Sequence, residues 1–375
     1  MKSILIGSVH SSEIVLREMI KLGFPLEMVF SLDDQYSENV SGYVPLHEIA
    51  EAYGIPFKKF KKIGSEDNIQ LIKEIAPDYI FVIGLSQLIN KEIINSAKIG
   101  VVGFHPTPLP KFRGRAAMVW QVLLGVRETK CSLFMIDEGI DSGDILGQEE
   151  YVIEDTDYAV DVSRKLGEAL SRLIPKVLEK IIKGNLELIK QKEEEATYLL
   201  IRRPEDGQID WKEPVEKIQR LIRAVSKPYP GAFSLYDGVH KVIIWRADYL
   251  ENRKYIGIPG QICEIHDAYM DVVGMDGIIR IWDYENIDGK WNTSIPYISI
   301  HKVATSNKYK KQSFAKKMMS YIENFAKRKR MDLRIDTHKD NKKMRNFIIS
   351  CGYKYTGEVV LQGELERLAY DKNVL

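Results

Sequence analysis

One histidine, His105, stands between an apolar run and a proline-rich segment. The run IGVVGF has the composition of a short buried strand. The segment HPTPLPKFRG holds three prolines, which lack a backbone N–H and fix their own φ. A histidine held at such a strand end can exchange a proton near neutral pH. General acid–base chemistry is therefore the first hypothesis, and a buried histidine without catalytic role is the alternative.

A second set of reactive side chains lies in the loop DEGIDSGD, which contains Asp137, Glu138, Asp141 and Asp144. A carboxylate beside an imidazole raises its basicity and fixes its tautomer, so we expect Asp141 to pair with His105. Two other interpretations stay open. The acids could bind a divalent metal, although their spacing is not that of an EF-hand, or they could simply form a turn. The sequence has no Walker loop, no GxGxxG motif and no nucleophile elbow.

The frame for these side chains is an alternation of apolar and amphipathic segments. Strands are predicted for KSILIGS, LEMVFSL, YIFVIGL and IGVVGFH, and helices for SEIVLREMIKLG, VPLHEIAEAYG and NIQLIKEIA. CSLFMIDEGIDSGDILGQEEYVI predicts strand, acidic loop and strand, and a long helix is expected over 159–183. This pattern is typical of an α/β fold with a doubly wound parallel sheet, whose ligands bind at the carboxyl ends of strands. His105 occupies such a position.

The pattern changes twice further along the chain. The polar stretch IKQKEEEATYLLIRRPEDGQIDWKEP is interpreted as a linker, followed by the short helix VEKIQRLIRAVS and five short β segments that predict a small barrel. From YISIHKVATS onward, strand–helix–strand–helix–strand predicts a third α/β segment. We expect domains at 1–190, 191–288 and 289–375.

Composition limits the classes of function. The chain has 375 residues, 45% of them hydrophobic and 29% charged, the balance of an ordinary soluble protein. No apolar run is long enough for a bilayer, and MKSILIGS favours a first strand over a signal peptide, so a cytoplasmic location without membrane contact is expected. Cys131, Cys263 and Cys351 are too far apart to predict a disulfide framework or metal cluster.

Charge is distributed unevenly. The segment 290–375 holds 19 Lys and Arg against 8 Asp and Glu, a net charge of +11. Such a tail can attract phosphate-rich partners such as coenzyme A or tRNA. Equally, it can consist of solvated helix faces.

HPTPLPKFRG followed by DEGIDSGDIL resembles the formyltransferase family that uses formyl-tetrahydrofolate. RRPEDGQIDW and IRAVSKPYPGAF resemble the second half of the same enzymes, most closely those that act on nucleotide-linked amino sugars. The resemblance covers about residues 1–288. It implies a Rossmann-like formyltransferase domain, then a small OB-like β-barrel, and formyl transfer from formyl-tetrahydrofolate to an amine. The implied acceptor is an amino sugar nucleotide, with methionyl-tRNA as the alternative and a non-catalytic folate- or sugar-binding regulator as a third reading.

The resemblance also implies roles for residues. His105 would take a proton from the amine or help to hold the oxyanion, and Asp141 would orient and stabilise His105. Two loops would form the pterin pocket through their backbone amides: Ser86, Gln87, Leu88 and Ile89 after the fourth strand, and Asp137, Glu138, Gly139 and Ile140 in the acidic loop. Alternatively, Leu88 and Ile89 begin the buried face of the next helix. Candidate substrate contacts are His10, Arg113 and Arg115, of which the two arginines could instead cap the following helix.

Gly103 departs from the family's Asn-x-His motif, whose asparagine is thought to hold the carbonyl oxygen. Loss of one such donor costs on the order of 3 kcal/mol, a hundredfold or more in rate. Another donor, from the backbone, Ser86 or Gln87, is the favoured explanation. Altered chemistry and weak catalysis are alternatives, and glycine could also merely give the strand end room. On the favoured reading Gly103→Asn changes turnover little, whereas a hundredfold gain would identify the missing donor as the defect.

The last segment, 289–375, resembles the second half of the GNAT acetyltransferase fold. Ser313 stands where that family has a glycine in the coenzyme A turn, and Ile348 stands at its frequent catalytic tyrosine. Asn341 matches a position that often meets the cofactor. Because the first half of the fold has no room upstream, we expect a partial module that is structural or mediates a homodimer. Acetyl-CoA binding is the less favoured alternative.

Overall fold

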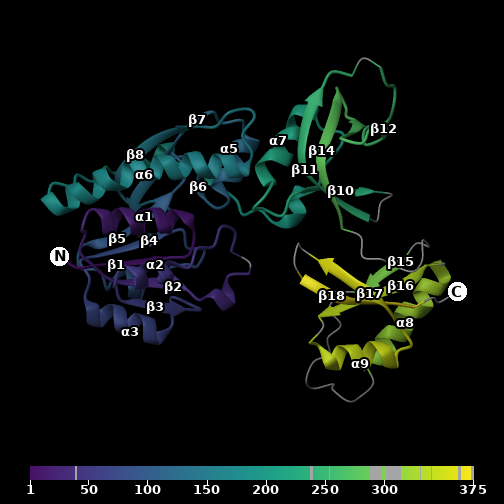
Figure 1. The fold of residues 1–375 in the computed structure, drawn as a ribbon, viewed down its shortest axis with the longest axis horizontal. Helices are drawn as coiled ribbons and strands as arrows, with labels where there is room; N and C mark the ends of the chain where they lie inside the picture. Colours follow the sequence, from purple (N-terminus) through teal and green to yellow (C-terminus); the bar gives the residue numbers. More distant parts are fainter. Residues whose placement is uncertain are drawn as a thin grey trace. The chain divides into compact units, whose positions relative to one another are not determined.

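The computed structural model of the chain (Figure 1) describes residues 1–38, 40–236, 240–252, 254–287, 297–300, 314–329, 331–338, 340–361 and 365–372. It divides into two compact units. The first is Met1–Ala232 with Ile244–Asp283, and the second is Phe233–Ile243 with Tyr284–Leu375. Among the described residues, no helix combines the length and apolarity that crossing a bilayer requires.

A seven-stranded sheet forms the frame of the first unit. Its strand order is β3-β2-β1-β4-β5-β7-β8. The first five run parallel: β1 (Ser3–Gly7), β2 (Leu26–Leu32), β3 (Phe57–Phe60), β4 (Tyr79–Ile83) and β5 (Gly100–His105). The antiparallel strands β7 (Glu128–Met135) and β8 (Ile145–Val152) complete the edge beside β5. The predicted Rossmann-like fold is confirmed. β3 was not predicted, because its sequence FKKF is too short and polar to show a strand period.

Helices cover both faces of this sheet (Figure 1). α1 (His10–Lys21) packs against α6 (Ala159–Lys183) on one face, where Leu5 of β1 contributes to their shared core. α3 (Glu66–Ile75) and α4 (Lys91–Ile94) cover the other face, where the alternate residues Ile4 and Ile6 are buried. Because successive side chains of a strand point to opposite faces, β1 anchors both layers.

Further short elements flank the sheet. They are the 3-10 helix η1 (Asp34–Tyr36), α2 (Leu46–Ala52), β6 (Arg113–Gly114) and α5 (Ala117–Leu123). The predicted long helix over 159–183 coincides with α6, whose Leu166, Leu170 and Leu173 are buried at helical spacing.

The stretch interpreted as a linker is ordered against the first domain, so that interpretation was wrong for its first half. β9 (Tyr198–Leu199) pairs with β6 in a two-stranded parallel sheet. Ile189 forms a bridge with Ile145 of β8. The 3-10 helices η2 (Glu193–Glu195) and η3 (Pro204–Gly207) lie on either side of β9. The polar side chains of the stretch interpreted as a linker form contacts with the sheet domain. These contacts join residues far apart in the sequence, so local composition does not predict them.

The predicted small β domain is confirmed as a five-stranded sheet that follows α7 (Val215–Val225). The strand order is β10-β11-β14-β13-β12. Its members are β10 (Ala232–Tyr236), β11 (His240–Leu250), β12 (Ile262–Ile265), β13 (Met270–Val273) and β14 (Ile278–Ile287). β12, β13 and β14 pair antiparallel.

The last segment forms a four-stranded sheet with the order β15-β16-β18-β17. In chain order its elements are β15 (Tyr297–Ile300), α8 (Phe314–Lys329), β16 (Asp332–His338), α9 (Lys342–Ser350), β17 (Lys354–Leu361) and β18 (Leu365–Lys372). Met319, Leu333 and Ile348 belong to its own small core. β18 was not predicted. The likeness to an acetyltransferase module stays a prediction.

Candidate active site

His105 and Asp141 come together at the carboxyl end of β5. His105 is the last residue of that strand and is only 6% exposed. Its Nδ1 atom lies 3.5 Å from Oδ2 of Asp141. The two residues are 36 positions apart in the sequence. Because β5 and β7 pair antiparallel with Val102 opposite Met135, β7 ends beside the first half of β5, and the acidic loop that follows turns back along β5 to place Asp141 beside His105.

The other ring nitrogen of His105 determines the tautomer. Nε2 lies 2.8 Å from the carbonyl oxygen of Phe112. Since a carbonyl only accepts hydrogen bonds, Nε2 carries the proton, and in the neutral ring Nδ1 keeps its lone pair on the side of Asp141. The tautomer was expected to be set by Asp141, but the proline-rich loop sets it.

Burial lowers the pKa of His105 below its ordinary value of 6.5. The attraction of Asp141 and the hydrogen bond to Phe112 act in the opposite direction but are smaller. The expected effect of Asp141 is confirmed, since its attraction raises the pKa of His105, but the net shift is downward because desolvation disfavours the imidazolium more than one carboxylate favours it. The result is a neutral imidazole near pH 7 with Nδ1 free to accept a proton.

The backbone at Asp141 is held in an unusual conformation. Its φ is +50°, which is uncommon for a residue with a side chain and costs roughly 1–2 kcal/mol. Two hydrogen bonds maintain it: the N–H of Gly114 donates to Oδ2 at 2.8 Å, and Nε2 of Gln191 donates to the Asp141 carbonyl at 2.8 Å. Gln191 also donates to the carbonyl of Gly143 at 2.7 Å. The carboxylate is thus aimed at His105 by groups from β6 and from the stretch after α6.

Arg113, a candidate substrate contact, is fully buried. Its guanidinium donates to Oε1 of Gln191 from two nitrogens, at 3.1 and 2.9 Å, and to Oε2 of Glu193 at 2.8 Å. The hydroxyl of Tyr198 accepts a further bond at 2.9 Å. With its donors engaged and no exposed surface, this guanidinium does not suit a phosphate grip. Its geometry corrects the sequence interpretation: Arg113 orients Gln191, which holds the Asp141 loop.

The other two candidate substrate contacts are accessible. The side chain of His10, the first residue of α1, is 58% exposed and lies 3.2 Å from Oε2 of Glu13. Arg115 is exposed, and one of its guanidinium nitrogens lies 3.5 Å from the carbonyl oxygen of Ser86. Both residues follow a strand of the first unit, so each remains a proposed substrate contact.

Gly103 leaves no room for a side chain. A Cβ atom there would lie 2.9 Å from Cγ1 of Ile136 and 2.9 Å from a ring carbon of Phe134. Phe134 is the antiparallel partner of Gly103 on β7. The space beside this strand is therefore filled by two apolar side chains. This packing fits the alternative in which Gly103 only gives the end of the strand enough room.

The two loops assigned to the pterin lie close to each other. The ammonium group of Lys91 lies 2.8 Å from Oε2 of Glu138. Each loop presents an apolar side chain to solvent, Leu88 at 85% exposure and Ile140 at 61%. Ile89 instead packs on the core beneath α3 and α4. The alternative of a buried helix face therefore holds for Ile89 and fails for Leu88.

The acidic loop and the loop after β4 also contain polar side chains whose hydrogen bonds are made within the protein. Asp137 accepts hydrogen bonds from the N–H of Gly139 at 2.9 Å and from the hydroxyl of Ser142 at 2.8 Å, so it shapes its own turn. The amide of Gln87 donates to the carbonyl of Lys61 at 2.8 Å, which removes it as a ready substitute for the missing asparagine. Ser86 is exposed. Among the residues that the structure describes, no three His, Cys, Asp or Glu side chains converge as metal ligands would.

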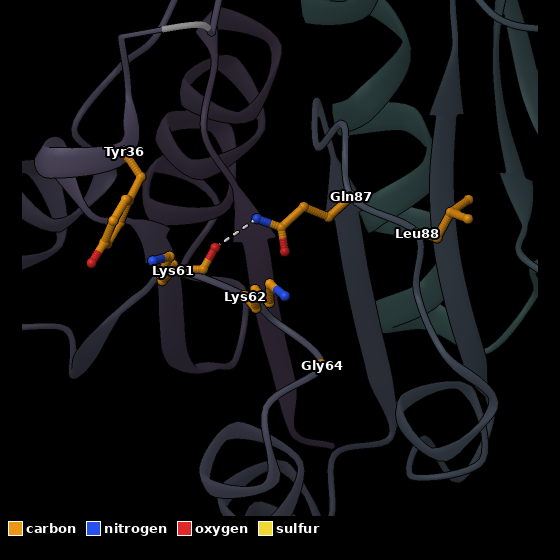
Figure 2. Close-up of a pocket in the computed structure, with 6 residues that line it drawn as sticks. All are labelled: Tyr36, Lys61, Lys62, Gly64, Gln87 and Leu88. Atoms are coloured by element: carbon orange, nitrogen blue, oxygen red, sulfur yellow. Dashed lines mark hydrogen bonds between the residues drawn. The ribbon is translucent and has the colours of Figure 1, made fainter. Parts of the chain in front are cut away.

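A pocket of about 510 Å³ opens next to the loop after β4 (Figure 2). It is lined by Tyr36, Lys61, Lys62, Gly64, Gln87 and Leu88. Sequence reasoning identified only Gln87 and Leu88. The other residues follow β2 and β3, and their position at the carboxyl ends of parallel strands was the signal that could have identified them.

In the last segment, the side chain of Asn341 accepts a hydrogen bond from the N–H of Met344 at 3.1 Å and caps α9. Ile348 is fully buried. Ser313 lies outside the described residues. Asn341 has a structural task of its own, and its role toward a cofactor stays a prediction.

Residues 38–178 match the family model described as formyl transferase, and residues 202–293 match that of the formyl transferase C-terminal domain. Together the two matches include His105 and Asp141 and most of the small β domain.

Solved structures show the same fold. An N-formyltransferase from Helicobacter canadensis, in complex with folinic acid and dTDP-3-aminofucose, is 20% identical over 76% of this chain and 100% of its own, with a TM-score of 0.57. A methionyl-tRNA formyltransferase from Clostridium thermocellum is 22% identical over 77% and 100%, with a TM-score of 0.52.

HypX from Aquifex aeolicus is longer. A structure of it in complex with tetrahydrofolic acid is 20% identical over 75% of this chain, with a TM-score of 0.53. The present chain spans 43% of the length of that protein.

Proposed function

The chain belongs to the formyl transferase family, and from this premise we propose that it transfers a formyl group from formyl-tetrahydrofolate to the amine of a nucleotide-linked amino sugar. One observation carries the chemical part of the proposal: a buried, neutral imidazole whose free Nδ1 lies 3.5 Å from a carboxylate at the carboxyl end of a parallel strand. This arrangement suits removal of a proton from an attacking amine.

His105 and Asp141 divide the work. Formyl-tetrahydrofolate supplies the one-carbon unit when it is bound. The Nδ1 of His105 accepts the proton that the amine loses as its nitrogen bonds to the formyl carbon. The bond between that carbon and the folate nitrogen then breaks, and the proton passes from His105 to the folate nitrogen so that tetrahydrofolate leaves. The carboxylate of Asp141 then faces an imidazolium and stabilises its charge, while Phe112 keeps the proton on Nε2 and the ring in place. The φ of +50° at Asp141 is the strain that this alignment requires.

The loops beside this pair suit a folate. Leu88 and Ile140 are exposed apolar side chains on two loops, and Lys91, the first residue of α4 just after the Leu88 loop, forms an ion pair with Glu138 of the other loop. A flat heterocycle between them would cover both side chains, and burial of apolar surface is the main source of affinity at such sites. Two of the similar proteins, from Helicobacter canadensis and Aquifex aeolicus, bind folates.

The acceptor is proposed from sequence and fold together. RRPEDG and YPGAF resemble enzymes for amino sugar nucleotides, and the Helicobacter canadensis relative binds dTDP-3-aminofucose. His10 and Arg115 are accessible for a polar acceptor of this kind. Methionyl-tRNA is the second candidate, because the segment 290–375 carries a net charge of +11 and a methionyl-tRNA formyltransferase shares the fold.

One experiment separates these possibilities. The purified protein is incubated with formyl-tetrahydrofolate and, separately, with a pool of amino sugar nucleotides or with methionyl-tRNA, and release of tetrahydrofolate is followed. Release with the sugar pool alone is expected, and release with methionyl-tRNA alone would overturn the sugar assignment. Folate binding without release in either pool would support a non-catalytic regulator. His105→Gln and Asp141→Asn serve as negative controls.

A further inference from the structure

The pocket shown in Figure 2 lies at the carboxyl ends of β2, β3 and β4. Its volume is about 510 Å³, and its lining residues do not include His105 or Asp141. Its lining includes Tyr36, Lys61 and Lys62, and Leu88 from the loop after β4. The activity proposed above gives no role to Tyr36 or to either lysine.

The charge of this pocket is positive. Lys61 and Lys62 are exposed, and the ammonium of Lys61 lies 4.6 Å from the ring centroid of Tyr36. In the described part of the chain, no carboxylate forms an ion pair with either lysine. Neighbouring Lys59, by contrast, is bound to Asp34 at 2.7 Å. Two adjacent cations without acidic partners favour a ligand that carries several negative charges.

Gln87 joins this pocket to the loop assigned to the folate. Its Oε1 accepts a hydrogen bond from the N–H of Ile63 at 2.9 Å, and its Nε2 donates to the carbonyl of Lys61 at 2.8 Å. The dashed line in Figure 2 marks the second of these bonds. The amide thus fixes the lysine segment against the loop that presents Leu88. A ligand that covers Leu88 can continue into the pocket without a change in the protein.

We propose that this pocket binds the carboxylates of the γ-glutamyl tail of the folate donor and selects polyglutamylated folate over the monoglutamate. This inference rests on the proposed function. The tail is an anionic chain attached to an aromatic ring, and it matches a cationic pocket with an aromatic wall. The diphosphate of a nucleotide acceptor shares the anionic chemistry. The tail is favoured because Gln87 and Leu88 line the pocket and also belong to the folate loop.

The test compares binding with turnover in the full-length protein. Binding of monoglutamyl and triglutamyl tetrahydrofolate is measured by calorimetry, and KM and kcat are measured with the matching formyl donors. The variant Lys61→Gln/Lys62→Gln removes the two pocket charges. Lys180→Gln/Lys183→Gln removes the same charge from α6 and serves as the matched control. A nucleoside diphosphate is titrated into each protein as a third ligand.

The unaltered protein is expected to bind the triglutamyl form about five- to twentyfold more tightly, the range that two exposed ion pairs provide. This preference falls with ionic strength. The Lys61→Gln/Lys62→Gln variant loses most of it with kcat changed less than twofold, and the control variant keeps it.

Three results would overturn the inference: equal binding of the two folates by the unaltered protein, no folate binding, or an unchanged preference in the variant. If the Lys61→Gln/Lys62→Gln variant binds the nucleoside diphosphate more weakly but keeps its preference for the triglutamyl folate, the pocket is assigned to phosphate. If the preference for the triglutamyl form depends on the two lysines but no formyl transfer is detected, the proposed function is refuted and this inference stands.

Discussion

Gln191 accepts two hydrogen bonds from the buried guanidinium of Arg113, at 3.1 and 2.9 Å, while its own amide donates to the carbonyl of Asp141 at 2.8 Å. A side chain 50 positions further along the chain thereby sets the direction of the Asp141 carboxylate. The proposed catalytic pair therefore depends on a residue outside the pair, which acts through the backbone of the Asp141 loop.

Gln191→Glu separates the two roles of this residue. A glutamate still accepts from Arg113, but it cannot donate to the loop carbonyls. We expect kcat to fall about ten- to a hundredfold, because small displacements of a catalytic group have effects of this size. KM and the thermal midpoint should change little. Gln70→Glu on the exposed face of α3 is the control, and equal kcat values in both variants would rule out the positioning role.

The pH dependence of turnover reports on His105. Burial lowers the pKa of His105 below 6.5, and the neutral ring is the active form, so activity is retained above pH 6.5 and lost as pH falls through the lowered pKa. In Asp141→Asn the attraction that raises this pKa is gone. In this variant the acid limb of the kcat/KM profile should therefore move to still lower pH. The plateau value of kcat/KM should also be lower than in the unaltered protein.

These profiles are measured by tetrahydrofolate release between about pH 4.5 and 8, a range that spans the ordinary titration of histidine. His338→Gln removes an exposed histidine of the last segment and should leave the limb in place. A limb that moves to higher pH in Asp141→Asn would contradict the assigned electrostatics.

Gly103→Asn tests the packing at the altered motif. The new Cβ would lie 2.9 Å from both Ile136 and Phe134, so we expect a loss of about 1–3 kcal/mol in the free energy of unfolding and no gain in turnover. In the background Phe134→Leu/Ile136→Ala the contacting atoms are absent. The same Gly103→Asn change should then cost markedly less, a non-additivity typical of residues in contact.

Denaturant unfolding of the four proteins measures this coupling. Additive free energies would show that the two side chains are not the obstacle. A hundredfold gain in turnover for Gly103→Asn alone would show that the missing amide donor limits the natural enzyme.

Leu88→Ser and Ile140→Ser test the folate loops. Both side chains are exposed, at 85% and 61%, so their loss should leave the thermal midpoint unchanged. If a folate covers them, each change should raise KM for formyl-tetrahydrofolate about tenfold, because burial of a large aliphatic side chain contributes roughly 1.5–3 kcal/mol.

Ile182→Ser on α6 is the matched control for these variants, with a side chain 51% exposed and far along the chain from either loop. Steady-state kinetics with varied folate and a fixed acceptor give the comparison. An unchanged KM in both loop variants would move the folate site away from these loops.

Local sequence signals were sufficient for much of this protein. The apolar and amphipathic periods predicted four of the five parallel strands and the full extent of α6, because those periods depend only on which face of an element is buried. The same signals placed His105 at a strand end. The short strand FKKF and the strand β18 were missed, since neither shows a clear period.

Tertiary structure alone decided how the site is held. Arg113 was a candidate substrate contact, yet it is buried against Gln191 and Glu193, which lie 78 and 80 positions away. The pocket of Tyr36, Lys61 and Lys62 likewise forms where strands separated in sequence end side by side. A residue's type and spacing determine what chemistry it can do. Which partners desolvate it, occupy its hydrogen bonds or fill the space beside it depends on contacts that only the folded chain creates.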